Sequence, residues 1–173
     1  MKTLAAVLLL LVALVVPAAA EDYPVPREPN QIFYVQRSLN SNTIVYAARL
    51  GADGKIDAEQ PVDVYWRRYN DEGERKELSS LERSMAFGVK WKPARGEPGS
   101  FKVRVVSYPK RPVLLRLVDG VPRLEGKVAG IPCRIDHAYL EGDESGSIPS
   151  VTRVDLYGYS LANGKLVKES FIP

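Results

Sequence analysis

The sequence predicts an all-β fold with one short helix, in which a single antiparallel meander closes as a barrel or a two-layer sandwich. Apolar and polar residues alternate over short runs, as in strands with one buried face. Turn-forming residues separate these runs at short intervals. The densest run, residues 61–69, places Val62, Val64 and Trp66 on one face. Burial of the large Trp66 ring is therefore expected to anchor the core.

The first 20 residues are expected to be a cleaved signal peptide. Lys2 precedes an apolar run over residues 4–16, too short to span a bilayer, and residues 18–20 (Ala-Ala-Ala) offer a signal-peptidase site. Residues 21–30 contain three prolines and predict an extended, loosely held leader. We expect one β-rich domain over residues 31–172, in a protein exported to the periplasm or medium and without a transmembrane segment after cleavage.

The remaining elements are predicted from the same alternation, with turns where Gly, Asn and Asp cluster. Residues 38–42 predict a turn, and Asp119-Gly120 and Asn163-Gly164 predict tight hairpins. Residues 74–86 predict the helix, because Leu78, Leu81 and Met85 recur at helical spacing as one apolar stripe. The predicted strands span residues 32–37, 43–50, 61–69, 87–92, 101–105, 113–118, 121–128, 131–140, 151–159 and 165–172.

Composition excludes several classes of function. After cleavage the chain has 23 basic and 21 acidic residues, and the resulting net charge of +2 is too small to imply a nucleic-acid partner. One cysteine, Cys133, and one histidine, His137, exclude an intramolecular disulfide, and they exclude a zinc site unless carboxylates supply the other ligands. No glycine-rich phosphate loop is present. We expect no cofactor and no metal.

The predicted strand over residues 131–140 places Cys133 and His137 on one face, about 13 Å apart along an extended chain. That separation is too great for a nucleophile and its base, so Cys133 is interpreted as a small, shielded hydrophobic residue. Glu141, Asp143 and Glu144 are interpreted as a solvated acidic loop, because they lack the spacing of a calcium-binding loop.

One cluster of polar and aromatic residues is the candidate ligand site. Arg37 shares a strand face with apolar neighbours and is expected to point inward, where a guanidinium needs a partner. One interpretation is a patch for an anionic or sugar-like ligand, formed by Arg37, Asn40, Asn42, Tyr65, Trp66 and Arg68. The other, which we favour, is an internal ion pair of Arg37 with Asp63 or Glu82, with the asparagines serving the turn.

Several short pieces of the chain resemble a bacterial family of domains of unknown function, number 4833. The resemblance covers roughly residues 30–172 and implies no catalytic residue, cofactor or substrate. The pieces that carry it are Arg-Ser-Leu-Asn-Ser-Asn-Thr-Ile-Val-Tyr (37–46), Pro-Val-Asp-Val-Tyr-Trp (61–66), Leu-Ser-Ser-Leu-Glu-Arg (78–83), Met-Ala-Phe-Gly (85–88), Val-Asp-Leu-Tyr-Gly (154–158) and Gly-Lys-Leu-Val-Lys-Glu (164–169).

The leading hypothesis is a non-catalytic domain of the cell envelope that binds a small ligand in a barrel mouth or another protein at a sheet edge. One alternative is an envelope hydrolase that uses carboxylates or Tyr and Ser groups. A second alternative is a small structural or inhibitory module. We predict a filled core with at most a shallow groove.

Overall fold

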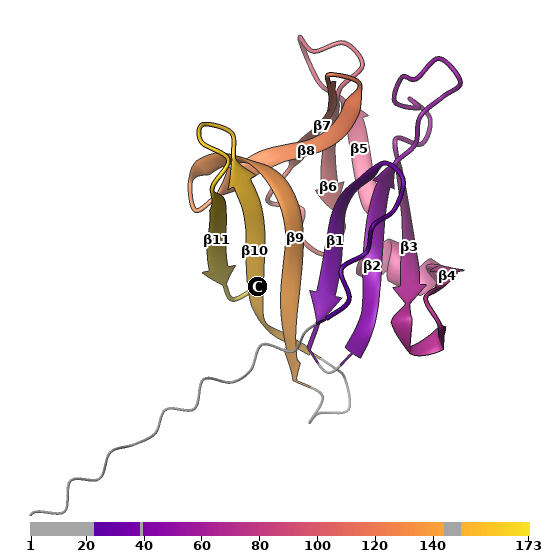
Figure 1. Ribbon diagram of the computed structural model, residues 1–173, viewed down its shortest axis with the longest axis vertical. Helices are drawn as coiled ribbons and strands as arrows, with labels where there is room; N and C mark the ends of the chain where they lie inside the picture. The colour runs from indigo at the N-terminus through magenta and orange to yellow at the C-terminus, as the bar shows by residue number, and fades with distance from the viewer. Residues whose placement is uncertain (1–22, 39, 144–149) are drawn as a thin grey trace, which may run out of the picture.

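The computed structural model describes residues 23–38, 40–143 and 150–173 (Figure 1). It confirms the predicted all-β class with one short helix, α1 (Ser80–Met85), and adds one 3-10 turn, η1 (Tyr69–Asp71). The strands are β1 (Gln31–Arg37), β2 (Asn40–Ala48), β3 (Val62–Arg68), β4 (Glu74–Glu77), β5 (Val89–Pro93), β6 (Phe101–Val105), β7 (Val113–Val118), β8 (Val121–Val128), β9 (Ile131–Asp143), β10 (Ser150–Ser160) and β11 (Leu166–Phe171).

The strands form one curled sheet, a half-barrel, that forks at β9 (Figure 1). The first residues of β9 pair with β8, and residues 137–140 pair with β1 on the same edge, while β10 follows the other edge. Strands β1–β4 therefore form one lobe and β5–β8 the other, with β9–β11 shared between them. The pairing of β1 with β9 is parallel; the other strand pairings are antiparallel.

The main hydrophobic core lies on the inner faces of the two lobes. Val62, Val64 and Trp66 are buried there, as the alternation predicts, and the ring of Trp66 packs edge-on against Phe87 with centroids 5.5 Å apart. Leu115 of the second lobe is fully buried in the same core. Apolar burial supplies most of the driving force for folding, so Trp66 is an anchor of this core.

The leader packs on the outer face of the first lobe, so the expectation of a loosely held segment is wrong for residues 23–30. Pro26 is fully buried, and the side-chain amide of Gln36 donates to the Pro24 carbonyl at 3.2 Å. Glu28 pairs with Arg67 at 2.5 Å. Prolines limit the conformational freedom that an ordered leader loses, which favours this extended docking.

The predicted helix over residues 74–86 is only half right. Glu74–Glu77 form the edge strand β4, and the helix is confined to α1. Of the predicted apolar stripe, Leu78 is buried, whereas Leu81 and Met85 are 67% and 69% exposed. Pairing of β4 with β3 satisfies backbone groups that a longer helix would satisfy internally, so tertiary pairing overrides the helical pattern.

A β-bulge in β9 breaks the predicted alternation. The register with β10 shifts by one residue between Tyr157, opposite His137, and Gly158, opposite Ile135. Asp136 is the extra residue, because a bulge places two residues of one strand opposite one of the other. Ile135 and Ala138 therefore both face the core, and His137 lies on the opposite face from Cys133, contrary to the prediction that they share one.

The tight turns agree better with the predictions than the helix does. Asp119 and Gly120 both have positive φ and join β7 to β8, as expected for a two-residue hairpin. The turn predicted at 38–42 is shorter than expected, because β2 already begins at Asn40. Within the described part of the chain, no helix combines the length and the apolar character needed to cross a bilayer.

Candidate functional site

An apolar cavity of about 210 Å³ lies between the two lobes. Val35 and Tyr46 line it from the first lobe, Val103 and Leu124 from the second, and Ala138 from the shared strand β9. Protein interiors rarely contain voids larger than a water molecule. The prediction of a filled core with at most a shallow groove is therefore wrong.

The fork of the sheet explains why the space is not filled. Strands β1 and β8 leave the same edge of β9 at different heights, so the inner faces of the two lobes diverge. Val35 and Ala138, paired across β1 and β9, are too small to bridge that gap. Alternation tells which residues face inward, but it does not tell how far apart two inward faces lie.

The cavity meets solvent beside the C-terminus. Ser107, Val151 and Pro173 line it and are exposed, which locates the opening. Arg111 lies at the same end, and its guanidinium is paired. It donates two hydrogen bonds to Glu169, at 2.9 and 2.6 Å. The backbone N–H of Ala129 donates to the same carboxylate at 2.6 Å. This closed network holds the rim of the opening in place.

Two aromatic rings pack beside the charged pair at the rim. The guanidinium carbon of Arg111 lies 5.8 Å from the Tyr108 ring centroid and 5.2 Å from that of Phe171, and the two rings stack at 5.1 Å. The hydrogen bonds from Arg111 lower the pKa of Glu169 below its ordinary value, and the same pairing raises the pKa of Arg111. Both groups are ionised at neutral pH and neutralise each other.

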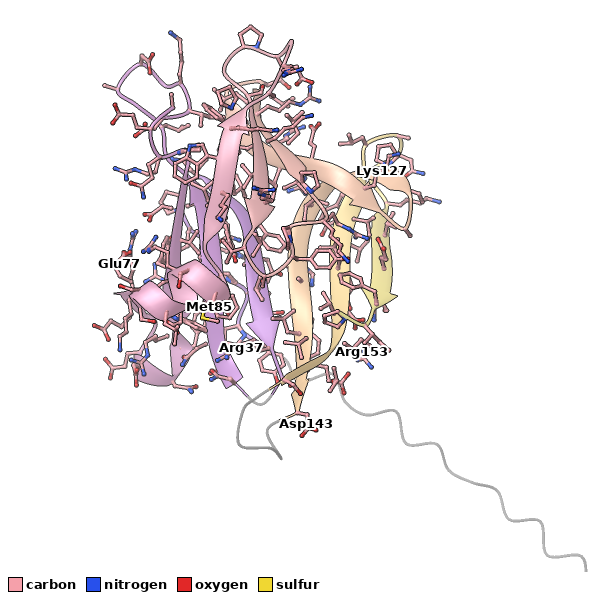
Figure 2. All side chains as sticks on the ribbon, turned by 180° about the vertical axis from the view of Figure 1, so that it is seen from behind. Arg37, Glu77, Met85, Lys127, Asp143 and Arg153 are labelled. Carbon is pink, nitrogen blue, oxygen red and sulfur yellow. The ribbon has the colours of Figure 1, made fainter. Side chains whose placement is uncertain are left out.

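A second, polar groove of about 540 Å³ lies at α1 and contains four of the six predicted ligand-binding residues, Arg37, Asn42, Trp66 and Arg68. The guanidinium carbon of Arg37 lies 4.9 Å from the Trp66 ring centroid. Figure 2 shows Arg37 near the end of β1, on the side of the molecule where α1 crosses. The fold therefore brings these four side chains together in a groove outside the apolar cavity, and their role as a ligand site stays a prediction.

Glu82 of α1 organises this groove. Its carboxylate accepts from the indole N–H of Trp66 at 3.1 Å and from the hydroxyl and backbone N–H of Ser79 at 2.7 and 2.8 Å. Burial raises the pKa of Glu82, but these hydrogen bonds and the charge of Arg37 outweigh burial and leave the pKa lowered. The charge of Arg37 thus contributes to the lowered pKa of Glu82. Asp63, the other carboxylate considered as a partner of Arg37, pairs with Arg75 at 2.7 Å.

The other two predicted residues lie elsewhere. Asn40 accepts a hydrogen bond from the backbone N–H of Asn42 at 2.8 Å, a role in the local chain path. Tyr65 lies on the outer face of β3, where its hydroxyl donates to Glu28 at 3.4 Å and Arg75 covers its ring at 3.8 Å. Burial raises the pKa of Tyr65 to about 12. Tyr65 is separated from the groove because adjacent strand residues face opposite ways.

The two residues with nucleophile or base chemistry do not meet. Cys133 is fully buried, as predicted, and burial raises the pKa of its thiol. His137 is stacked between Tyr34 and Tyr157, with centroids 4.9 and 4.3 Å away, and its Nδ1 lies 2.8 Å from Asp136. Among the residues that the structure describes, no three His, Cys, Asp or Glu side chains are grouped so that they could hold a metal ion. Glu144 of the predicted acidic loop lies outside the described residues.

The cavity and its rim are what sequence reasoning missed. The inward positions were predictable one strand at a time, but Arg111 and Glu169 are 58 residues apart and carry no motif. Arg111 and Glu169 meet only because the fold brings distant segments of the chain side by side.

Comparison with known proteins gives a family and no closer relative. Residues 33–170 match the model of a family described as Domain of unknown function (DUF4833), which confirms the resemblance of the short pieces. No curated protein and no solved structure matches the chain.

Proposed function

The chain belongs to the DUF4833 family, and we propose that it is a non-catalytic binding domain that holds a small apolar molecule, or the apolar part of a larger one, in the cavity between its lobes. The volume and the apolar walls of that cavity carry the proposal. At about 24 cal/mol per Å³, leaving 210 Å³ empty costs about 5 kcal/mol. Net stabilities of domains are about 5–15 kcal/mol, so an occupant that restores the lost contacts is strongly favoured.

The composition of the walls selects the chemistry of the occupant. Water is a poor filler, because an ordered water needs two to four polar partners. Tyr46, which is polar, already donates its hydroxyl to the Phe87 carbonyl at 2.9 Å. Arg111 at the rim is already neutralised by Glu169. Neither group requires a polar ligand, which favours a ligand without charge inside the cavity.

The same walls favour binding over catalysis. Among the described residues that line the cavity there is no carboxylate, histidine or cysteine. The hydroxyls of Tyr46, Ser107 and Tyr108 also line the cavity, but a hydroxyl nucleophile needs an adjacent general base, and these lining side chains offer no carboxylate or imidazole for that role. The proposed domain works outside the cytoplasm, in the bacterial envelope or the medium. The basic start, apolar run and Ala-Ala-Ala of residues 1–20 support that location.

A second candidate is the polar groove of Arg37, Asn42, Trp66 and Arg68. The Trp66 ring beside a guanidinium is an arrangement that can stack on a sugar or an anionic ring. The hydrogen bond from Trp66 to Glu82 and the negative charge of Glu82 near Arg37 both compete with such a ligand, so we favour the apolar cavity. A purely structural module would show no apolar binding, and an envelope hydrolase would turn over its substrate.

The test is a thermal-shift and calorimetric titration of residues 21–173 with benzene, indole and medium-chain alcohols. A ligand at about 100 times its dissociation constant stabilises the native state by about 2.7 kcal/mol, which raises the Tm of a domain this size by about 5–10 °C. Ala138→Leu places a larger side chain in the cavity and is expected to abolish that shift.

The matched control is Ala58→Leu, at an exposed position in the loop before β3. It adds the same atoms outside the cavity and is expected to leave the shift unchanged. A full shift in folded Ala138→Leu would place binding elsewhere, and the absence of any shift in the unsubstituted chain would leave the structural module as the better reading.

A further inference from the structure

Four cations form a block on the outer face of the second lobe, which we call the basic face: Lys90, Lys92, Lys102 and Arg104. The register of β5 and β6 sets Lys90 opposite Arg104 and Lys92 opposite Lys102. All four side chains are exposed, while Val103 between the last two is buried on the inner side. The alternation of two paired strands thus aims four positive charges in one direction.

This arrangement is unfavourable within the protein. Directly opposite residues in a sheet have Cβ atoms about 4.5–5.5 Å apart, and like charges there are destabilising. In the part of the chain that the structure describes, no carboxylate forms an ion pair with any of the four. Arg116, on the neighbouring strand β7, is by contrast paired with Glu125 at 2.7 Å. An anionic partner from outside would relieve the repulsion.

The net charge of the whole chain conceals how unevenly charge is distributed. Residues 89–134 contain eleven lysines and arginines and three acidic residues, whereas the rest of the chain after residue 20 has twelve basic and eighteen acidic residues. The second lobe is therefore strongly cationic and the remainder anionic. Such an asymmetry orients the molecule toward an anionic surface as it approaches.

Two apolar side chains beside the basic face are exposed, but they do not belong to it. Trp91 of the edge strand β5 is 38% exposed, and because it pairs with Val103 it points to the opposite face from Lys90 and Lys92. Met85, at the end of the helix that leads into β5, is 69% exposed. The charge of the face therefore selects the partner, and clusters of four or more Lys and Arg are typical of proteins that bind anionic lipids.

We propose that the basic face docks on the surface of a membrane that contains anionic phospholipids. Lys90, Lys92, Lys102 and Arg104 contact lipid phosphates, while Trp91 on the opposite face takes no part in the contact. Cations that two paired strands hold on one face suit a layer of phosphates, since the charges need little rearrangement to meet it. This inference is independent of the cavity and stands whether or not the cavity holds a ligand.

The test is co-sedimentation of residues 21–173 with vesicles of phosphatidylcholine, with and without about one-third phosphatidylglycerol, at about 0.1 and 0.5 M salt. We expect binding only to the anionic vesicles, and much weaker binding at high salt. Each Lys or Arg near such a surface contributes about fivefold in affinity, so the double variant Lys92→Gln, Lys102→Gln is expected to bind about 25-fold more weakly.

The control is the double variant Lys55→Gln, Lys165→Gln, which changes the net charge equally at exposed lysines outside the basic face. It is expected to bind nearly as well as the unsubstituted chain, and thermal melts check that both variants fold. Equal loss in both variants, equal binding to neutral vesicles or no binding at all would overturn the proposal. So would selective binding of a DNA duplex, or dimerisation that the Lys92 and Lys102 substitutions abolish while no vesicle is bound.

Discussion

At the scale of single residues, two glycines occupy positions where another chain segment leaves no room for a side chain. A Cβ built on Gly88 would lie 1.8 Å from the backbone oxygen of Arg83, at the end of α1. A Cβ on Gly158 would lie 2.9 Å from the backbone oxygen of Arg134 and from the Cβ of Cys133. Backbone atoms cannot move aside as a flexible side chain can, so both sites require glycine.

Gly88→Ala is accordingly expected to destabilise the fold by about 1–3 kcal/mol, the usual cost of overpacking. The midpoint of urea denaturation measures the loss. Gly142→Ala is the matched control, because its added Cβ would meet nothing closer than 3.5 Å and the φ of Gly142 is not in the left-handed region. Similar midpoints for both variants would show that the approach of Arg83 to Gly88 is not tight.

The Arg111–Glu169 pair predicts how stability depends on pH. The pKa of Glu169 is lowered in the folded state, so its contribution is fully present above the ordinary glutamate pKa, about 4.3, and is lost as pH falls through the lower folded value. Glu169→Gln is therefore expected to be less stable than the unsubstituted chain at pH 7, by about 1–3 kcal/mol.

The difference in unfolding free energy should shrink as the pH falls below the ordinary glutamate pKa, because the unfolded chain then binds a proton that the native carboxylate does not. It should vanish once the pH is below the lowered pKa of the folded state. Denaturant melts at a series of pH values measure it. If the difference in unfolding free energy between the two chains stays constant down to acid pH, the charge of Glu169 does not contribute to stability.

At the scale of elements, α1 is stable because of its first turn and its anchor to the sheet. A helix of six residues is too short to persist on its own. Its N-cap Ser79 and Glu82 form a capping box, in which each satisfies a backbone N–H of the other. The same Glu82 carboxylate accepts from Trp66, which ties the helix to the core.

Ser79→Ala is expected to destabilise the protein by about 1 kcal/mol, since it removes the N-cap. Thermal or urea unfolding followed by tryptophan fluorescence measures the loss and also reports on the surroundings of Trp66. Ser84→Ala is the control: Ser84 is in the same helix, exposed and outside the capping box, and its loss should change stability by no more than about 0.5 kcal/mol. An equal effect of both substitutions would argue against the cap.

At the scale of the whole molecule, the fork at β9 determines both the cavity and the division of charge between the lobes. The leader then braces the first lobe from outside, through buried Pro26 and the Glu28–Arg67 ion pair, and it also contacts β9, where the ring centroids of Tyr23 and Tyr139 are 5.9 Å apart. Within the described part of the chain, the four cations on the outer face of β5 and β6 stay exposed.

A chain that begins at Gln31 is therefore expected to be about 2–4 kcal/mol less stable than one that begins at Glu21, from the lost burial of apolar side chains and a charged hydrogen bond. Calorimetry of the two chains gives the difference. Glu28→Gln in the longer chain separates the ion pair from the packing and should account for only part of it. Equal stabilities would show that the leader does not brace the first lobe.

Features that depend on a single strand or turn were predictable from the amino-acid pattern. Alternation of apolar and polar residues is enforced by the geometry of a strand, so the buried faces of β3 and β6 were predictable, as was the Asp119-Gly120 turn, whose positive φ values suit those residues. Four members of the polar groove lie on β1, β2 and β3, which follow one another in the chain and in the sheet, so short-range pairing brings Arg37 and Trp66 to the same end of the lobe.

Features that depend on pairing between distant segments were not predictable in this way. The bulge at Asp136 reverses the faces of β9 without any mark in the sequence, and residues 74–77 become a strand because β3 offers them an edge. The separation of the two lobes, and hence the cavity and its Arg111–Glu169 rim, follows from where β1 and β8 join β9. Local chemistry fixes the direction in which a side chain points, but what it meets there depends on long-range pairing.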